Sequence, residues 1–208
     1  MLPLTREDFY RQVESKLHKS ALTDSQKAGY CVLLGYARQN SVQGYFLAYV
    51  LATVFHETGR TMKPVRETFA KSDNQAILNL NAAYKRGQLT WVKKPYWLLE
   101  GGHAYFGRGL VQITHRENYE RLGKALDLDL VNSPDLALNL NVACRILFKG
   151  MLEGLFTGKK LDDYIDEEDQ DWIEARHIIN GTDCADKIAG YAKIYYDIIS
   201  KYPDQVIP

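Results

Sequence analysis

The sequence contains little cysteine, and the cysteines that it has form no pattern. Cys31, Cys144 and Cys184 are an odd number spread over 208 residues, which argues against a disulfide framework and favours synthesis in a reducing compartment. Each is more easily explained as a small core residue than as a nucleophile. A cysteine amidase, which needs an activated thiolate, is therefore a minor alternative.

Long hydrophobic segments are also missing. The first residues, MLPLTREDFYRQ, lack the apolar stretch of a secretory signal. No apolar run approaches the roughly 18 residues of a membrane-spanning helix, so we expect no transmembrane segment. The sequence predicts a soluble protein made in the cytoplasm, which reaches a substrate outside the cell only after release or export.

The charges are balanced, with 26 Lys and Arg against 26 Asp and Glu. A nucleic-acid-binding protein usually shows a basic excess, so we expect no nucleic acid partner. Hydrophobic residues make up 46% and charged residues 25%, which is typical of one globular domain spanning 1–208. None of the histidines forms an HExxH motif or another close ligand pair, so we expect no metal site; they are His18, His56, His103, His115 and His177.

Helical patterns dominate the chain. Residues 87–113 are different, since they are rich in glycine and aromatics and lack helical periodicity; they leave room for a small β element at most. The acidic run at 161–171 is expected to be a solvated loop. The fold class is therefore mainly α. Capping residues and periodicity place helices at about 5–19, 23–39, 41–58, 72–85, 115–126, 133–152, 170–179 and 184–200.

A carboxylate stands at the end of the most apolar of these helices. The helix at 41–58 is hydrophobic around most of its circumference, so it should be buried, and Gly59 is suited to end it. Glu57 then lies in the last turn, where the partial negative charge of the helix terminus and partial burial both favour the protonated carboxyl. This is the property that a general acid needs near neutral pH.

A second carboxylate follows ten residues later, beyond Pro64. Glu67 is the candidate general base, and Arg60 or Arg66 would keep it ionised. Inverting cleavage of a glycosidic bond uses two carboxyl groups roughly 6.5–9.5 Å apart with a water between them. Glu100 is the alternative base.

The densest group of chemically interesting residues is Tyr105 to Thr114. Gly107 and Gly109 flank Arg108 and permit a tight backbone close to a ligand. Gln112 and Thr114 have the same parity, so in an extended segment both would face one side. Their neutral polar groups suit sugar hydroxyl and N-acetyl groups. The run is not a phosphate loop, because no GxxxxGK[ST] pattern accompanies it.

Together these motifs resemble glycoside hydrolase family 19, which includes plant-type chitinases and related bacterial and phage endolysins. The similarity extends over about residues 45–195. It implies a lysozyme-like, two-lobed α fold with a central cleft, in which residues of about 60–110 form the smaller lobe. The matching runs, in order, are His56-Glu57-Thr58, Tyr105-Phe106-Gly107-Arg108-Gly109, Gln112-Ile113-Thr114, Asn118-Tyr119 and Ile178-Ile179-Asn180-Gly181.

The resemblance implies a role for each matching residue. Glu57 matches the general acid, and Thr114 matches a hydroxyl residue that helps to hold the attacking water. Glu67 follows Glu57 more closely than the base does in plant enzymes, a spacing similar to that of the phage branch. No cofactor or metal is implied. The residues expected to bind substrate are Tyr105, Arg108, Gln112, Asn118, Tyr119 and Asn180.

Other departures from the plant enzymes bear on the substrate. The plant disulfides are absent, and Lys187 stands where the family has an arginine in its C-terminal helix. The missing disulfides, the lack of a secretory signal and the compact chain together favour a phage or prophage endolysin that acts on peptidoglycan, with chitin as the alternative polysaccharide. A chain of this size with no net charge is expected to work as a monomer. A sugar-binding module that has lost catalysis is the alternative from another functional class.

Overall fold

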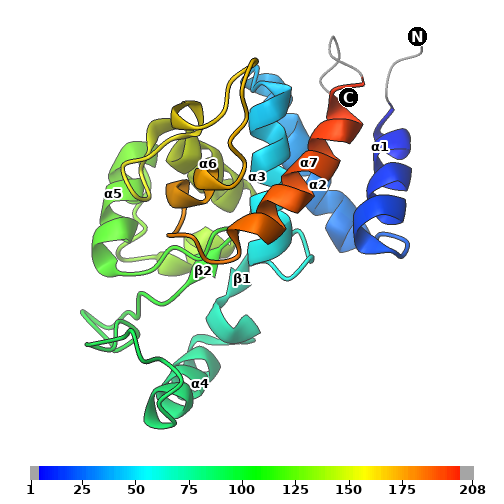
Figure 1. The fold of residues 1–208 in the computed structure, drawn as a ribbon. Coiled ribbons are helices and arrows are strands. Elements are labelled where there is room, and N and C mark those ends of the chain that lie inside the picture. The colour runs from blue at the N-terminus through cyan, green and yellow to red at the C-terminus, as the bar shows by residue number, and fades with distance from the viewer. Residues whose placement is uncertain (1–4, 202–208) are drawn as a thin grey trace. The chain divides into compact units, whose positions relative to one another are not determined.

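The structure is a computed structural model that describes residues 5–201, and it is mainly helical as predicted (Figure 1). Short 3₁₀ segments lie at Glu67–Phe69, Pro134–Leu138, Leu161–Asp163 and Glu174–Ile178, and a π-helical turn at Glu14–His18 extends α1. The named elements are α1 (Arg6–Val13), α2 (Asp24–Gln39), α3 (Gly44–Glu57), β1 (Val65–Arg66), α4 (Asp73–Lys85), β2 (Arg108–Gly109), α5 (Arg116–Leu126), α6 (Leu140–Glu153) and α7 (Ala185–Ile199).

The chain divides into two compact units. Unit 1 combines the chain up to Lys63 with the chain from Leu147 onward, and unit 2 is Pro64–Ile146. The smaller lobe expected at about 60–110 falls mostly within unit 2, which continues to the middle of α6. Among the described helices, none is long and apolar enough to cross a membrane.

In unit 1, α3 packs along α7 (Figure 1). Every α3 side chain from Leu47 to Phe55 is buried, which confirms the expectation from its hydrophobic circumference. The two preceding helices begin at the predicted caps. Thr5 and Thr23 each accept a hydrogen bond from the third backbone N–H of their helix and complete a capping box.

The end of α3 shows why Glu57 is held in place. Gly59 adopts φ +57°, and the Arg60 N–H donates to the carbonyl of Phe55 at 2.8 Å. This is the six-residue closing bond that a left-handed glycine allows at a helix C-terminus. The buried Thr58 hydroxyl donates to the carbonyl of Val54 and accepts from the Met62 N–H, at 2.7 and 3.1 Å. The prediction that Gly59 ends this helix is confirmed.

Unit 2 contains the small β element that the sequence allowed. β1 and β2 pair antiparallel, with Val65 opposite Gly109 and Arg66 opposite Arg108. The long loop after α4 returns along that helix and buries a small apolar cluster with it. Its fully buried members are Ala76, Leu80, Trp97, Ala104 and Phe106.

Two helix predictions were wrong in their extent. The helix predicted at 133–152 is interrupted at Asn139, which has extended ψ of 128°. The Asn139 side chain accepts hydrogen bonds from the backbone N–H groups of Asn141 and Val142, so it caps the start of α6 and competes with continuation of the preceding turn. The segment predicted as a helix at 170–179 forms only the 3₁₀ turn at Glu174–Ile178.

The cysteines are all free, as expected from their number. Cys144 is buried, and burial raises the pKa of its thiol to about 12. Cys184 is exposed, so the expectation that each cysteine is a core residue was wrong for this one.

Candidate functional site

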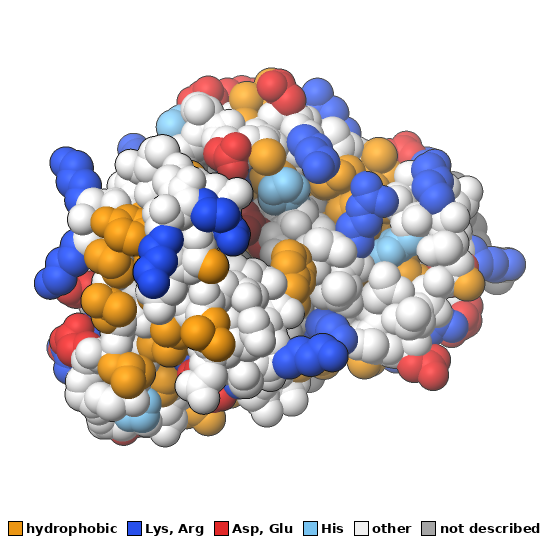
Figure 2. Space-filling view, turned by 90° about the horizontal axis from the view of Figure 1, so that it is seen from below, with side chains coloured by type: hydrophobic (Ala, Val, Ile, Leu, Met, Phe, Trp, Pro, Cys, Tyr) orange, Lys and Arg blue, Asp and Glu red, His pale blue; other side chains and the backbone are white. Residues whose placement is uncertain are grey.

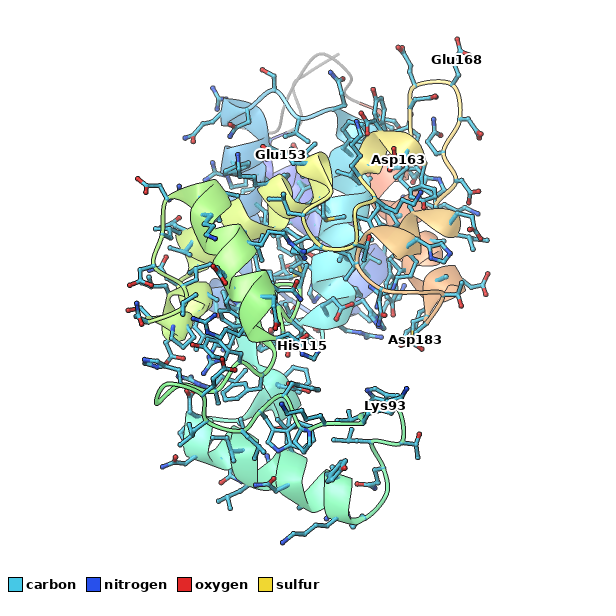
Figure 3. All side chains as sticks on the ribbon, turned by 90° about the vertical axis from the view of Figure 1, so that its left-hand side faces the viewer. Lys93, His115, Glu153, Asp163, Glu168 and Asp183 are labelled. Atoms are coloured by element: carbon cyan, nitrogen blue, oxygen red, sulfur yellow. The ribbon has the colours of Figure 1, made fainter. Side chains whose placement is uncertain are left out.

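Glu57 is the last residue of α3, and its side chain is 16% exposed. It forms an ion pair with Arg176, whose Nη1 donates to Oε1 at 2.7 Å. Arg176 is itself only 3% exposed, and its Nε donates to the carbonyl of Asp183 at 2.9 Å. Asp183 lies on the turn before α7 (Figure 3). A buried, fixed positive charge therefore faces the candidate acid and offsets the negative field of the helix end.

Sequence reasoning missed Arg176. The resemblance pointed to the position of Lys187, and the structure instead supplies the guanidinium from the turn just before Ile178. The only available signal was that Arg176 closely precedes the matching Ile178–Gly181 run. Two segments 119 residues apart meet at this ion pair, and such a contact has no local sequence pattern.

His56 precedes the candidate acid and is half-buried. Its burial lowers the pKa of the imidazole, with Glu57 opposing the shift and Arg176 and Lys187 adding to it. The ring is therefore neutral at neutral pH. His56 contributes a dipole and packing beside Glu57 rather than a second positive charge.

Glu67 lies in unit 2 directly after β1. Both of its carboxylate oxygens accept hydrogen bonds, Oε1 from the Tyr96 hydroxyl at 2.6 Å and Oε2 from the Gly107 N–H at 2.7 Å. The Glu67 N–H in turn donates to the carbonyl of Gly107 at 2.6 Å. Proximity to Glu67 and burial both raise the pKa of the Tyr96 hydroxyl, burial most strongly, so Tyr96 remains a donor.

The expectation that Arg60 or Arg66 holds Glu67 in its ionised form was wrong. Arg66 is bound to Asp73 at 2.8 Å and to Asp135 at 2.6 Å, and the Arg60 guanidinium lies over the ring of Phe55. Neutral donors hold Glu67 instead. A Cβ at position 107 would approach Gln112 Oε1 to 2.7 Å, so a larger residue there would require the end of the Gln112 side chain to shift.

The Arg108 side chain is buried and is not accessible to a ligand, which corrects the prediction that it binds substrate. Its side chain has no exposure and makes ion pairs with Asp73 and Asp135. The guanidinium lies 3.8 Å from the centre of the Phe106 ring, and Nη1 donates to the Ala104 carbonyl at 2.8 Å. Arg108 and Arg66 together cross-link α4, the β pair and the 134–138 turn.

Tyr105 and Tyr119 are buried as well, so their predicted contacts with substrate are also corrected. The Tyr105 hydroxyl donates to the Val131 carbonyl at 3.1 Å. The Tyr119 hydroxyl donates to the Phe106 carbonyl at 2.8 Å. Both rings hold the Tyr105–Thr114 run against α5, so the density of aromatic residues in this run reflects core packing.

The parity argument for Gln112 failed because the segment is a turn rather than a strand. Gln112 has φ +53°, and its amide donates to the Val65 carbonyl at 3.0 Å, which ties the turn to β1. Thr114 is half-buried and its carbonyl accepts from the Asn118 side chain at 2.7 Å. The Asn118 oxygen accepts from Arg121 at 2.6 Å.

Thr114 keeps its hydroxyl available, since it has no hydrogen-bond partner within residues 5–201. Glu100, the alternative base, is 66% exposed and pairs with Arg116 at 3.4 Å. Neither oxygen of Glu100 is held by a backbone N–H or a hydroxyl of the described chain. Glu67 is therefore the better-organised carboxylate of unit 2.

Asn180 lies in unit 1 and is exposed at a hollow of about 550 Å³. Its Oδ1 accepts from the Gly181 N–H at 2.9 Å, which leaves the side-chain NH₂ free to donate. This volume lies within the usual range of small-molecule binding sites. The other residues around the hollow are Thr157, Lys159, Tyr164, Glu174, His177, Ile179 and Gly181.

Comparison with known proteins agrees with the sequence resemblance. The sequence profile of the chitinase class I family, glycoside hydrolase family 19, matches residues 48–157. Chitinase 3 of Oryza sativa subsp. japonica is 33% identical over 127 residues, which are 51% of this chain and 40% of the rice protein. Acidic endochitinase of Petunia hybrida is 54% identical over 35 residues, 17% of this chain and 14% of its own.

The chain thus spans well under half the length of the curated relatives that it matches. A solved bacterial family 19 chitinase aligns over 96% of this chain and 98% of its own, with 18% identity and a TM-score of 0.49. The profile match covers more than half of the chain and includes both Glu57 and Glu67. The chain therefore belongs to glycoside hydrolase family 19, the chitinase class I family.

Proposed function

We propose that this protein hydrolyses β-1,4 bonds in polymers of N-acetylated amino sugars, with Glu57 as general acid and Glu67 as general base. The observation that carries the proposal is the organisation of these two carboxylates. Glu57 is largely buried and paired with Arg176, and both oxygens of Glu67 are fixed by Tyr96 and Gly107. Carboxyl groups held in this way have the defined geometry that acid–base catalysis requires.

The proposed reaction has one displacement step. Glu57 transfers its proton to the glycosidic oxygen as the bond from that oxygen to the anomeric carbon breaks. A water attacks the anomeric carbon from the opposite face, and its proton passes to Glu67. The Thr114 hydroxyl helps to hold this water. Arg176 stabilises the carboxylate that forms as Glu57 loses its proton.

The stereochemical outcome follows from the use of a water nucleophile. A single displacement inverts the configuration at the anomeric carbon. Proton NMR of the first product, recorded before mutarotation, distinguishes inversion from retention. A retained configuration would contradict the role of Glu67 as a base that activates water.

We propose first the sugar unit that the enzyme recognises and then the polymer that contains it. The common element is a β-1,4-linked N-acetylglucosamine unit, which chitin and peptidoglycan share. The relatives are named chitinases and endochitinases, so we propose chitin oligomers as the first substrate to test. Peptidoglycan, which the sequence favoured, is the second candidate; the absence of disulfides from this chain distinguishes it from the plant enzymes that the sequence otherwise resembles.

The test is digestion of both polymers by the wild type and by Glu57→Gln, with mass spectrometry of the soluble fragments. New reducing ends produced by the wild type alone support the proposal, and the fragment masses identify the sugar whose bond was cut. Release of peptides from intact glycan would show an amidase or peptidase. Binding to either polymer without any cleavage would show a sugar-binding module.

A further inference from the structure

Exposed hydrophobic side chains are concentrated in unit 2. Of the large hydrophobic residues that are exposed in residues 5–201, six lie between positions 69 and 99, and only two lie elsewhere. Single exposed apolar residues need no explanation, but a local concentration marks an interaction surface. The six are Phe69, Leu78, Tyr84, Trp91, Leu98 and Leu99.

Four of the six fall in a short segment that is also basic. This basic–apolar segment, residues 84–99, comprises the end of α4 and the loop that returns along it. It contains Lys85, Arg86, Lys93 and Lys94, and no acidic residue occurs anywhere from 74 to 99. The whole chain has no net charge, so these four positive charges without nearby acidic residues in the sequence make the segment locally basic.

The positive charges are free to act on a partner. All four side chains are exposed, and none makes an ion pair with a carboxylate of the described chain. Arg86 donates only to the neutral side chain of Gln88. Lys93 lies on the returning loop and projects away from α4 (Figure 3). Hydrophobic and basic side chains occur together on the face that is seen from the α4 side (Figure 2).

The segment is firmly built beneath its surface, so the exposure is not a consequence of an unfolded loop. Trp97 is fully buried and its Nε1 donates to Asn81 at 2.9 Å. The Trp97 ring also meets Tyr84 edge to face at 5.7 Å between centroids. Leu89 and Val92 pack against the same cluster. Trp91, Leu98 and Leu99 are sequence neighbours of these anchored residues and remain 70%, 52% and 68% exposed.

We propose that the basic–apolar segment docks onto a lipid bilayer with anionic phospholipid head groups. Tryptophan and leucine favour the boundary between head groups and acyl chains, and lysine side chains reach from that depth to the phosphates. Each basic residue near an anionic bilayer adds to the affinity in a salt-dependent way. This surface binding involves the exposed side chains of the segment and does not depend on the proposed hydrolysis, in which the half-buried Tyr96 of the same segment holds Glu67.

Charge and side-chain type distinguish this partner from the alternatives. A second copy of the chain would bring two sets of four positive charges together, which disfavours self-association through the segment. Chitin is neutral and gains nothing from four cations, and leucine side chains offer the hydroxyls of any sugar polymer no hydrogen bonds. A bilayer that is anionic at its surface and apolar beneath it complements both features.

The experiment is co-sedimentation of the full-length protein with phosphatidylcholine vesicles that contain or lack phosphatidylglycerol. We expect binding only to the anionic vesicles, and weaker binding as the salt concentration rises. A Lys93→Gln, Lys94→Gln double variant should bind about fivefold more weakly for each charge removed. Trp91→Phe should abolish a blue shift of tryptophan fluorescence that accompanies wild-type binding.

Lys159→Gln, Lys160→Gln provides a matched control, because these residues are also adjacent exposed lysines but lie in unit 1. Circular dichroism verifies that each variant is folded. Equal loss of binding in both double variants would overturn the proposal, as would absence of binding to anionic vesicles. Patch-dependent binding to insoluble chitin or peptidoglycan without vesicle binding, or a dimer that Trp91→Ser dissociates, would also overturn it.

Discussion

The two units use charge in opposite ways. In unit 1 the candidate acid is ion-paired, whereas the core hydrogen-bond network that includes His18, Tyr30 and Tyr195 is neutral. In unit 2 the candidate base is held by neutral donors, whereas the core network is ionic and centres on Arg108. The two environments suit two different roles. A charged partner stabilises the carboxylate that a general acid becomes when it loses its proton, whereas neutral donors hold a general base in place without cancelling its negative charge.

The largest expected effect is on catalysis by Glu57. Glu57→Gln removes the transferable proton and should lower kcat about 10²- to 10⁴-fold. It also leaves Arg176 buried without a counter-charge, so we expect a loss of about 1–3 kcal/mol in stability. Turnover of chitin or peptidoglycan fragments and thermal unfolding measure the two effects. Near-normal turnover would remove Glu57 from the mechanism.

The second effect tests the other carboxylate. Glu67→Gln should lower kcat about 10²- to 10³-fold, but with less loss of stability, because its partners Tyr96 and Gly107 are neutral. Comparing the unfolding temperatures of the two glutamine variants tests the contrast between a charged and a neutral environment directly. If Glu100→Gln abolishes activity and Glu67→Gln does not, the base is Glu100.

The third effect concerns stability of unit 2. Arg108→Met leaves Asp73 and Asp135 without their buried partner and should destabilise the fold by about 2–4 kcal/mol. Arg66→Met is the matched control, since it pairs with the same two carboxylates from a more exposed position, and should cost less. Urea unfolding of both variants measures the difference, and equal losses would show that burial of Arg108 is not the cause.

The fourth prediction tests whether Tyr96 positions the candidate base or binds substrate. Tyr96→Phe removes one of the two hydrogen bonds to Glu67 and leaves the ring packed against Trp97. We expect kcat to fall about tenfold with KM nearly unchanged, because the loss affects the base rather than substrate contacts. A change confined to KM would instead place Tyr96 in the substrate site.

The smallest effect concerns the neutral network of unit 1. Burial lowers the pKa of His18 to about 4, and Arg60 adds to the shift. Because the unfolded imidazole binds its proton near pH 6.5, stability is full above that pH and declines as the pH falls towards 4. The half-exposed ring limits the loss to about 1–2 kcal/mol. Urea unfolding at pH 7 and pH 5 should show this dependence, and His18→Gln should reduce it.

The sequence predicted elements whose determinants are local. Thr5, Thr23 and Gly59 mark helix ends because each makes hydrogen bonds or adopts a backbone conformation within a few residues of its own position. The prediction failed at Asn139, where a side chain caps the next helix. It also failed at Gln112, because the argument that Gln112 and Thr114 face the same side assumed an extended segment, whereas Gln112 has a left-handed backbone conformation.

In the candidate site, too, features with local determinants could be predicted from sequence and contacts between distant segments could not. Glu57 and Glu67 could be proposed from sequence because helix termini, spacing and family motifs depend on the order of residues along the chain, and both assignments remain predictions. The partners of these carboxylates were not found: Arg176 is 119 residues from Glu57, and Tyr96 is 29 residues from Glu67. The same motifs led to the prediction that Arg108, Tyr105 and Tyr119 bind substrate, whereas all three are buried. A motif indicates which residue types occur together, but it does not indicate whether a side chain faces a ligand or the core.

What the sequence determined by itself is the mainly helical class, the buried α3 with Glu57 at its end, and membership in a hydrolase family. Only the tertiary structure decided which charges are paired, which aromatic residues are buried, and which basic and apolar residues are exposed. The physical reason is that helix propensity and capping act over a few residues. Burial and ion pairing depend on contacts between segments that the chain brings together only when it folds.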